Sequence, residues 1–487
     1  MKSYKDSLIY KQASFSLGLS LLYTLIIGLA AFEWETFEIR PQVMILMLAN
    51  GIFSIIQAGL VWKLKRESRK TLVISKSSQL IAGGLIVSLL GGNIFLLISS
   101  LYIMKKQVRP GYIYAVYMVV TDLLVIGVSA LNLFKPFVTN TFIPAMALLL
   151  VVVVLHLIVL VGYEKVQKLT GVPRMIILGI LTLTVLTGNL FVLLVAYSMV
   201  RQSQEEPGVN RRKTLFEKII RNQASMTGLL FIIFLVAISI CSYWTFSYGL
   251  AVNNDYGNIL QPPSLVYPFG TDNFGRDVFS RIVFGARISL TVGVLATMIP
   301  LIFGGLLGAI SGYYGRHTDN LIMRFLDILY AIPGILLAIT IVAAFGASTS
   351  NLIIALSIGY IPSYARTMRA NVIQVTNLEY VEASRAVGND NRNIIWKHVI
   401  PNSMAPMIVR ATLTIGSAII ATSSLSYLGL GVENYIPEWG NILRSGSAYL
   451  ETEPYLAIYP GLAIIALVLS FNFLGDGIRD ATDPRLS

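Results

Sequence analysis

A polar, charged stretch at 379–402 lies between two apolar runs, and its residue types suit a rigid surface for another protein. Thr376 opens a T-x-x-E sequence, which predicts a capping box at the start of a first helix. Gly388 suits the position after that helix, where a positive φ is needed. Asp390 can cap a second short helix, which Pro401 is expected to end. The pattern therefore predicts a helical hairpin in the aqueous phase.

Asp122 and His156 are ionisable residues inside long apolar runs. An ionised side chain at the centre of a membrane costs about 2.5–3.5 kcal/mol on insertion scales, so each should face a partner or water. The pair predicts a proton or ligand site, a buried hydrogen-bonded pair, or a contact with another subunit. His156 shares no metal-ligand spacing with His317 or His398, so we expect no metal site.

Sequence signatures of catalysis are missing from the chain. It has no G-x-x-x-x-G-K-[ST] phosphate cradle and no Gly-Lys dipeptide. It also lacks a Ser-His-Asp, H-E-x-x-H or paired-cysteine pattern, and its single cysteine, Cys241, predicts no disulfide. We therefore expect the chain not to be an enzyme and not to hydrolyse ATP itself.

The composition is that of a membrane protein. Of the 487 residues, 55% are hydrophobic and only 13% are charged, whereas soluble domains carry about 25% charged residues. The mean hydropathy is +0.71. The net charge of +12 comes from basic residues in short loops between apolar runs, so it does not indicate nucleic-acid binding. An all-α integral membrane protein is predicted.

About twelve segments are long enough to cross a bilayer as helices, which takes roughly 20 residues each. The first is too long for a cleavable signal peptide. The predicted spans are 14–32, 43–62, 79–104, 111–134, 141–163, 174–200, 226–247, 287–312, 328–346, 351–368, 404–428 and 456–475.

Three basic runs face one side if the N-terminus is cytoplasmic, and two other runs disagree with this orientation. The concordant residues are Lys2, Lys5 and Lys11, then Lys63, Lys65, Arg66, Arg69, Lys70 and Lys76, then Arg201, Arg211, Arg212, Lys213, Lys218 and Arg221. The discordant residues are Lys105, Lys106 and Arg109, then Lys165, Lys168 and Arg174. The balance predicts cytoplasmic N and C termini.

The polar stretch 201–225 divides the chain into a front part, 1–200, and a second part, 226–487. We expect a six-span membrane extension, a cytoplasmic linker and a six-span core, in that order.

The front part resembles a duplication. SLLGGNIFLL and TVLTGNLFVL lie 96 residues apart and place Gly92-Asn93 opposite Gly188-Asn189. Each copy would hold three spans, so the second copy would be inverted, as in some transporters. The alternative is that two leucine-rich helices resemble each other by composition.

The 379–402 stretch resembles the cytoplasmic loop of ABC-importer permeases, which reads E-A-A, three residues, G, nine residues, I-x-L-P. Ser384, His398 and Ile400 depart from this pattern, although histidine at that point resembles the peptide and nickel branch. The residues that we carry over as an ATPase-docking loop are Glu382, Ala383, Ser384, Arg385, Gly388, Asp390, Arg392, His398 and Pro401.

A second passage, 267–294, is similar to the sequence before the second span of C-type subunits of oligopeptide, dipeptide and nickel permeases. Tyr267 replaces the usual histidine. Aspartates and arginines here are expected to pair with each other at the outer interface, and Arg287 to reach the headgroups. The matching residues are Gly270, Thr271, Asp272, Gly275, Arg276, Asp277, Arg281 and Arg287.

Three more passages, 323–339, 425–443 and 475–486, follow the same family in the same order. In the first, Pro333 predicts a kink or hinge near the start of a span. In the second, Trp439 is expected at the membrane interface.

The resemblance implies a type I ABC-importer permease core of six helices, preceded here by about six extra helices. It implies four kinds of partner: a second, B-type permease, two ABC ATPases, an extracellular solute-binding protein and membrane lipid. ATP and Mg would bind the ATPases, so no cofactor is expected in this chain. The expected location is the inner, cytoplasmic membrane of a bacterium.

In that assembly the 379–402 loop is expected to transmit ATPase motion to the attached spans. The implied cargo is oligopeptides or dipeptides. Two alternatives remain, a nickel or metal-chelate importer and a membrane regulatory or receptor protein that reuses the permease core. The front six spans are compatible with a scaffold, a docking module or a gate.

Overall fold

The computed structural model describes residues 8–33, 38–70, 74–105, 109–202 and 215–483. Contacts divide the chain into two units, Met1–Leu124 with Leu150–Gln223, and Val125–Leu149 with Ala224–Ser487. Residues 203–214 of the predicted 201–225 linker lie outside the described residues. In the described part, nearly all regular secondary structure is helical, and the exceptions are the two-residue β1–β2 ladder and an isolated bridge between Thr271 and Asp277, so the all-α prediction is confirmed.

The first unit consists of helices with one strand pair, and α5 and α6 contribute their distal ends to the second unit. The elements are α1 (Leu8–Ala31), β1 (Phe32–Glu33), β2 (Glu38–Ile39), α2 (Pro41–Lys70), α3 (Lys76–Leu85), η2 (Ile86–Gly91), α4 (Ile94–Ile103), α5 (Pro110–Ala130), α6 (Phe142–Val161), α7 (Tyr163–Gln167), α8 (Val172–Thr184), η4 (Val185–Thr187), α9 (Phe191–Gln202) and α10 (Leu215–Ile219). The short helix η3 (Leu131–Phe134), between α5 and α6, belongs to the second unit.

The predicted span 79–104 is a hairpin rather than one crossing helix. Gly92 has φ +73°, and Asn93 caps α4, so the chain reverses between α3 and α4. The two ends of the segment meet again, because Gln79 Nε2 donates a hydrogen bond to the backbone oxygen of Met104 at 3.2 Å. A segment whose ends meet leaves on the side where it entered.

The predicted span 174–200 has the same form. Gly188 has φ +82° between η4 and α9. Arg174, near the start of α8, donates through Nη2 to the backbone oxygen of Met199, near the end of α9, at 2.5 Å. Each hairpin follows two long helices, and its turn holds a buried asparagine, Asn93 or Asn189.

The second unit contains the remaining helices. They are α11 (Gln223–Thr245), α12 (Tyr248–Val252), η5 (Tyr256–Asn258), α13 (Val278–Tyr314), α14 (Arg316–Tyr330), α15 (Gly334–Phe345), α16 (Thr349–Thr376), α17 (Glu379–Ala386), α18 (Asn391–Ile394), the π-helical η6 (Ile395–Val399), α19 (Ile400–Tyr427), α20 (Trp439–Ser447) and α21 (Tyr455–Thr482).

Among the described residues, eight helices are long and apolar enough to cross a membrane, or nine if a bent pair counts as one span. The bent pair is α14 with α15, which turn by 78° at the break before Pro333, where a kink was predicted. The twelve-span count is therefore not reached, mainly because two predicted spans are hairpins. A third, α16, has 28 residues but is too polar to be counted.

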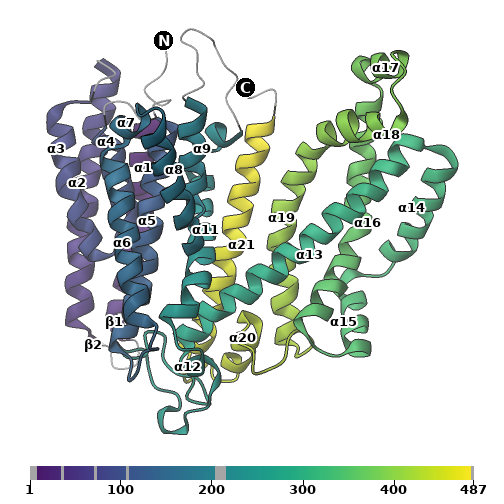
Figure 1. Cartoon of the computed structure of the whole chain (residues 1–487). Coiled ribbons are helices and arrows are strands. Elements are labelled where there is room, and N and C mark those ends of the chain that lie inside the picture. The colour runs from purple at the N-terminus through teal and green to yellow at the C-terminus, as the bar shows by residue number, and fades with distance from the viewer. Residues whose placement is uncertain (1–7, 34–37, 71–73, 106–108, 203–214, 484–487) are drawn as a thin grey trace. The chain divides into compact units, whose positions relative to one another are not determined.

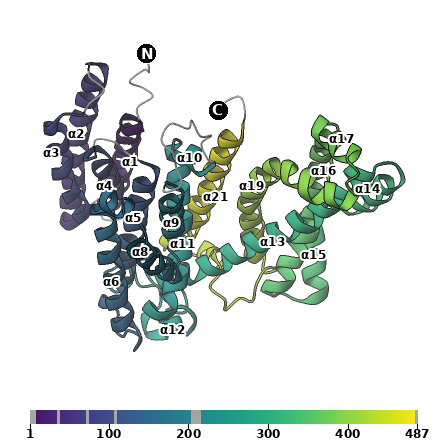
Figure 2. The ribbon, with the colours of Figure 1, turned by 45° about the horizontal axis from the view of Figure 1, so that its top comes forward.

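Close helix packing in the second unit depends on glycine. Helices α13 and α16 lie side by side (Figure 1 and Figure 2). A Cβ atom at Gly308 would lie 2.2 Å from the backbone oxygen of Ala365, and one at Gly304 would lie 2.7 Å from that of Ile361. Only residues without a side chain allow the two backbones to approach this closely.

The two predicted functional regions lie at opposite ends of the second unit. Figure 1 shows α17 and α18 at one end of the long helices, and α12 and α20 at the other. Helices α16 and α19 flank the α17–α18 loop and run to the opposite end, so a displacement of the loop can pass along both.

Candidate functional site

The first part of the predicted docking loop is a short helix, α17, with a Schellman end. Gly388 has φ +88° and donates its N–H to the oxygen of Arg385 at 2.9 Å, while Asn389 donates to that of Ser384 at 3.2 Å. The predicted capping box is wrong. Leu378 is the N-cap, and the hydroxyl of Thr376 donates back to Ile373, because α16 continues to that residue.

The second part of the loop does not end at proline. Asp390 caps α18 as predicted, accepting from the N–H of Asn393 at 3.3 Å. The helix then continues through the π-helical η6 into α19, so the expected stop at Pro401 is wrong. Pro401 lies in the first turn of α19, where its missing N–H is tolerated. The wider π-turns before it accommodate the chain without breaking the helix.

Buried aliphatic side chains hold the loop on the ends of the long helices. Val381, Ile394 and Val399 are each fully inaccessible and pack with Val372 of α16 and Met407 of α19. A docking surface on this base moves with the two helices rather than independently of them.

Most predicted docking residues face outward, with one exception. Ser384 is buried and accepts a hydrogen bond from Asn389 Nδ2 at 3.0 Å, so it stabilises the turn instead of offering a contact. The exposed residues are Glu382, Ala383, Arg385, Gly388, Asp390, Arg392 and Pro401, while His398 is half-buried.

Two exposed apolar side chains in the loop were missed at the sequence level. Val387 is 84% exposed and Trp396 is 55% exposed, beside the charged residues. A large aromatic residue at the surface of a rigid hairpin is typical of a protein–protein contact. Trp396 itself is the signal, because a tryptophan stands next to Lys397 and His398 in a loop predicted to face water.

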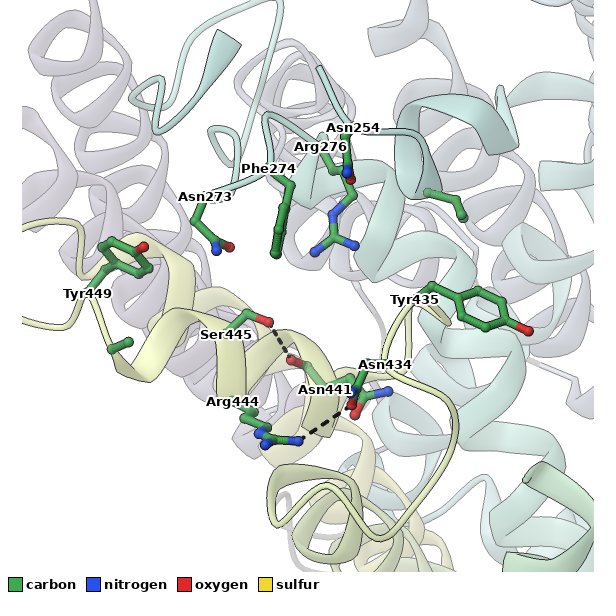
Figure 3. A pocket seen from close by; sticks show the side chains of 12 residues that line it. Asn254, Asn273, Phe274, Arg276, Asn434, Tyr435, Asn441, Arg444, Ser445 and Tyr449 are labelled. Atoms are coloured by element: carbon green, nitrogen blue, oxygen red, sulfur yellow. Dashed lines mark hydrogen bonds between the residues drawn. The ribbon is translucent and has the colours of Figure 1, made fainter. Parts of the chain in front are cut away.

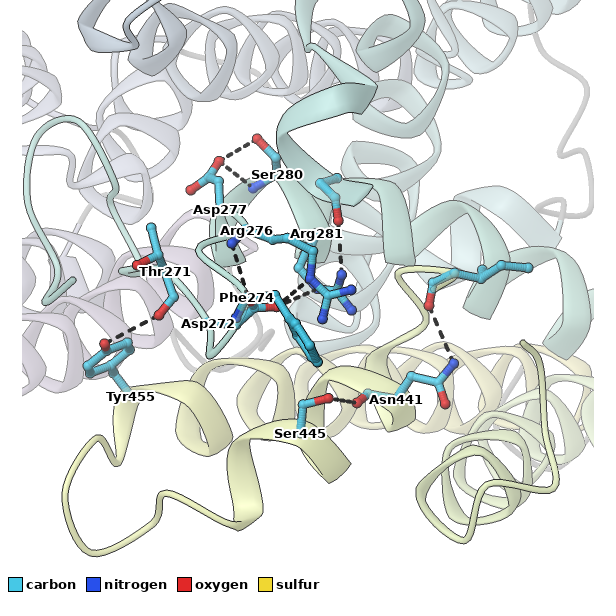
Figure 4. Close-up of polar contacts among 12 residues, drawn as sticks. Thr271, Asp272, Phe274, Arg276, Asp277, Ser280, Arg281, Asn441, Ser445 and Tyr455 are labelled. Atoms are coloured by element: carbon cyan, nitrogen blue, oxygen red, sulfur yellow. Dashed lines mark hydrogen bonds and ion pairs between the residues drawn. The ribbon is translucent and has the colours of Figure 1, made fainter. Parts of the chain in front are cut away.

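At the other end of the unit, the 270–277 segment is a closed, hydrogen-bonded loop (Figure 4). Asp272 accepts from Arg276 Nε at 2.8 Å and from the Arg276 N–H at 3.0 Å. Arg281 lies 3.7 Å from the same carboxylate and donates to the oxygen of Ala251 at 2.9 Å. The expected pairing is thus present for Asp272, and it is buried rather than exposed at the interface.

Glycine and threonine complete this loop. Gly270 and Gly275 both have φ +74°. A Cβ atom at Gly275 would lie 1.7 Å from the backbone oxygen of Asp255, so no other residue fits there. The hydroxyl of Thr271 donates to Asn258 at 2.5 Å and accepts from the N–H of Gln261 at 2.7 Å.

Two expectations for the outer motif are wrong. Asp277 pairs with no arginine of the motif; its carboxylate caps α13 and binds Lys135. Arg287 does not extend to the headgroups, because its Nη2 donates to Ser242 Oγ at 2.9 Å and its guanidinium lies 3.4 Å from the ring centroid of Tyr243. Through these contacts the motif is attached to Lys135, just after η3, and to α11.

Trp439 is a core residue rather than an interfacial one. It is fully buried at the start of α20, and its Nε1 donates to the backbone oxygen of Ile282 at 2.9 Å. A Cβ atom at Gly285 would lie 2.6 Å from its ring, so the glycine makes room for the indole. Its neighbour Glu438, also fully buried, caps α20 through the N–H groups of Gly440 and Asn441. Burial raises the pKa of Glu438 above its usual value.

A pocket of about 690 Å³ opens between the outer motif and α20 (Figure 3). Asn273, Phe274 and Arg276 line it on the motif side, while Arg444 and Tyr449 line it on the α20 side. The pocket offers two guanidinium groups and aromatic surfaces at the end of the unit away from the α17–α18 loop.

Asp122 and His156 are in contact, which is one of the arrangements that the sequence predicts. His156 Nδ1 lies 2.5 Å from Asp122 Oδ2, and its Nε2 lies 2.9 Å from the hydroxyl of Thr184. Asn189, at the turn of the second hairpin, donates to Asp122 Oδ1 at 2.7 Å. These contacts satisfy the side-chain oxygens of Asp122 and both ring nitrogens of His156, as expected for a buried polar group inside a membrane.

Part of the chain is similar in sequence to known proteins. Residues 304–487 match a family described as "Binding-protein-dependent transport system inner membrane component". The dipeptide transport system permease protein DppC of Alkalihalophilus pseudofirmus is 45% identical over 271 residues, which cover 56% of this chain and 89% of the relative. This chain belongs to the oligopeptide and dipeptide family of ABC-importer permeases. The predicted resemblance is confirmed, and as a transport subunit this permease is not an enzyme.

Other known proteins are also similar to this permease. The glutathione transport system permease protein GsiD of Pectobacterium atrosepticum is 38% identical over 274 residues, which cover 56% of this permease and 91% of the relative. An inward-facing structure of the methionine ABC transporter MetNI overlaps 42% of the permease and 97% of its own chain, at a TM-score of 0.35 and 20% identity. With its spanning helices, the permease is a multi-pass protein of the inner membrane.

Proposed function

We propose that this permease forms half of the translocation path of an ATP-driven importer for dipeptides or short oligopeptides. A second, B-type permease forms the other half, two ABC ATPases bind at the α17–α18 loop, and an extracellular solute-binding protein delivers the cargo. ATP and Mg belong to the ATPases. The family relationship supports the peptide cargo, since DppC and GsiD are described as dipeptide and glutathione permeases.

The main observation for the coupling role is that the loop shares one buried cluster with two long helices. Val381 of α17 and Val399 of η6 lie in one buried cluster with residues of α16 and α19. A push on the exposed face of α17 therefore moves two long helices together. Because both helices run to the other end of the unit, such a push can alter the path there.

The chemistry of the loop supports an ATPase as the partner. Arg385 and Arg392 give a basic face, which suits acidic residues, while Trp396 and Val387 supply apolar contact. Glu382 is exposed on the first helix and adds a negative charge near its N-terminus.

The outer pocket supports a role in receiving cargo or its binding protein. Arg276 and Arg444 can pair with carboxylates, which peptides carry at one end and acidic proteins carry on their surface. We propose that this end faces outward and that the α17–α18 loop faces the cytoplasm, as do the N and C termini.

A reconstitution experiment tests the function. The permease is purified from its native membrane in mild detergent, and copurifying proteins are identified by mass spectrometry. We expect two Walker-motif ATPases and a second permease, and ATP-dependent uptake of a labelled dipeptide when the complex is placed in liposomes. Recovery of the permease without an ATPase, or ATP-dependent uptake of a nickel chelate but not of peptides, would refute the proposal.

A further inference from the structure

A pocket of about 560 Å³ opens in the first unit, beside the mouth of the α3–α4 hairpin. Gln79 and Met104, at the two ends of the hairpin, line one side of it. The start of α5 and the short helix α7 line the remainder. This volume is typical of a small-ligand site, and no step of peptide transport requires it.

Cationic side chains outnumber acidic ones in this pocket. Lys105, Arg109 and Lys168 line it together with one carboxylate, that of Glu164. Lys105 Nζ lies 3.1 Å from Glu164 Oε1, and Arg109 Nη1 donates to Gln167 at 2.8 Å. The pKa of Glu164 is lowered, chiefly by the hydrogen bond from Lys105 and also by Arg109 and Lys168, so the positive field reaches this point.

Two tyrosines give the pocket fixed walls. Tyr112 donates its hydroxyl to the backbone oxygen of Leu101 at 3.0 Å, and its ring packs edge-on against Tyr163 at a centroid distance of 6.1 Å. Lys105 Nζ lies 5.3 Å from the centroid of the Tyr112 ring, a cation–π geometry that positions the ammonium. The site is therefore built before any ligand arrives.

The pocket lies where apolar segments end. Helix α4 ends just before Lys105, the apolar helix α5 begins after Arg109, and the apolar helix α6 ends just before Tyr163. Exposed apolar side chains adjoin these ends, since Met104 is 44% exposed and Val161 is 78% exposed. Charge at the rim and apolar surface next to it match a headgroup above acyl chains.

We propose that this pocket binds the phosphate of an anionic phospholipid headgroup, with the acyl chains along the adjoining apolar surface. Lys105, Arg109 and Lys168 would share the phosphate, and Glu164 would be displaced from Lys105. Because the pocket joins the mouth of the first hairpin to α5 and α7, a bound lipid would hold these elements together at the membrane surface. The proposal is independent of the cargo and of the ATPases.

Native mass spectrometry of the purified full-length permease tests it. The protein is titrated with phosphatidylglycerol and, separately, with phosphatidylcholine, which carries a phosphate but no net charge. We expect phosphatidylglycerol to be retained preferentially. Inorganic phosphate, added in roughly tenfold excess over the lipid, should not displace it. Equal retention of both lipids, or displacement by inorganic phosphate, would overturn the lipid assignment.

Matched variants locate the site. We expect R109Q/K168Q to lower phosphatidylglycerol affinity by about 25-fold, since each cation near an anionic surface contributes roughly fivefold. Lys165→Gln, an exposed change on the same short helix outside the pocket, should have no effect. Glu164→Gln should raise affinity, because it removes the competing carboxylate, and misfolding cannot mimic a gain. Unchanged affinity in R109Q/K168Q, or no gain in Glu164→Gln, would contradict the proposal.

Discussion

Lys135, in the turn after α5, forms a buried ion pair with Asp277, the N-cap of α13, and both side chains are fully inaccessible. The Lys135 ammonium also lies 5.3 Å from the ring centroid of Tyr267. Burial lowers the pKa of Lys135, and Asp277 opposes that shift. A residue of the predicted extension thus neutralises a residue of the permease motif, so the segment Val125–Leu149 is part of the second unit.

Removing one partner of this pair should destabilise the permease strongly. We expect Lys135→Met to lower the free energy of unfolding by about 3–5 kcal/mol, because Asp277 would remain buried without a counter-charge. The double variant K135M/D277N should recover much of the loss, since asparagine can still cap α13. Thermal unfolding in detergent measures both. A Lys135→Met protein as stable as the parent, or as stable as the exposed control Lys165→Gln, would contradict the assignment.

The family and most long helices follow from the sequence, whereas the hairpins do not. Hydrophobicity over 79–104 and 174–200 is the same for a crossing helix and for two short antiparallel helices. The difference lies in the turn, where Gly92 and Gly188 adopt positive φ. The Gly-Asn dipeptide in each segment was visible in the sequence, but it was used only as a sign of duplication.

The hairpins also explain the basic loops that disagreed with the predicted orientation. If 79–104 and 174–200 each return to the side where they entered, the runs near Lys105 and Lys165 face the same side as the others. Two copies of two spans plus a hairpin would then share one orientation rather than being inverted. The duplication itself stays a prediction, as does the cytoplasmic N-terminus. Lys106 and the run at 211–213 lie outside the described residues.

Side-chain partners were the least predictable part of the candidate site. The sequence identified Asp277 and Arg287 as important, but their partners come from segments 142 and 45 positions away. No local pattern reveals contacts at such separations. By contrast, the local geometry at Gly388 and Asp390 was predicted correctly, because caps depend on neighbouring residues only.

Gly388 should be essential for coupling rather than for folding. A valine at φ +88° would be strained, although no atom lies within 4 Å of the position. We expect Gly388→Val to abolish ATP-driven uptake while the protein still inserts into the membrane. Gly388→Asn should retain uptake, because asparagine tolerates a positive φ. Glu382→Lys should also abolish uptake, by reversing an exposed charge on α17. Normal uptake by Gly388→Val in liposomes would rule out this role for the loop.

Trp396 should contribute much of the ATPase contact. It is 55% exposed on η6, and aromatic residues in the centre of an interface can contribute about 2 kcal/mol or more. We expect Trp396→Ala to reduce ATPase copurification by at least about tenfold. A matched control is Trp62→Ala, which removes an exposed tryptophan of α2 in the first unit. Equal ATPase recovery from the two variants would show that Trp396 lies outside the interface.

The Asp122–His156 pair should be structural. Because its polar atoms are hydrogen-bonded to one another and to Thr184 and Asn189, we expect Asp122→Ala to lower stability by about 1–3 kcal/mol. Uptake per folded molecule should be the same in mild acid and at neutral pH. Asp122→Asn should be milder, since an amide preserves one oxygen acceptor. A pH-dependent uptake that either variant abolishes would instead indicate a proton site.

Glu438 should make the permease more stable in mild acid than at neutral pH. Burial raises its pKa above the usual 4.5, so the folded state binds the proton more tightly than the unfolded state does. The resulting stabilisation is complete below pH 4.5 and is lost as the pH rises through the raised pKa. We expect Glu438→Gln, which keeps an oxygen to cap α20, to reduce this pH dependence of the melting temperature. If the variant and the parent show the same slope from mild acid to neutral pH, Glu438 does not titrate in this range. The parallel change Glu433→Gln, in the preceding loop, serves as the control.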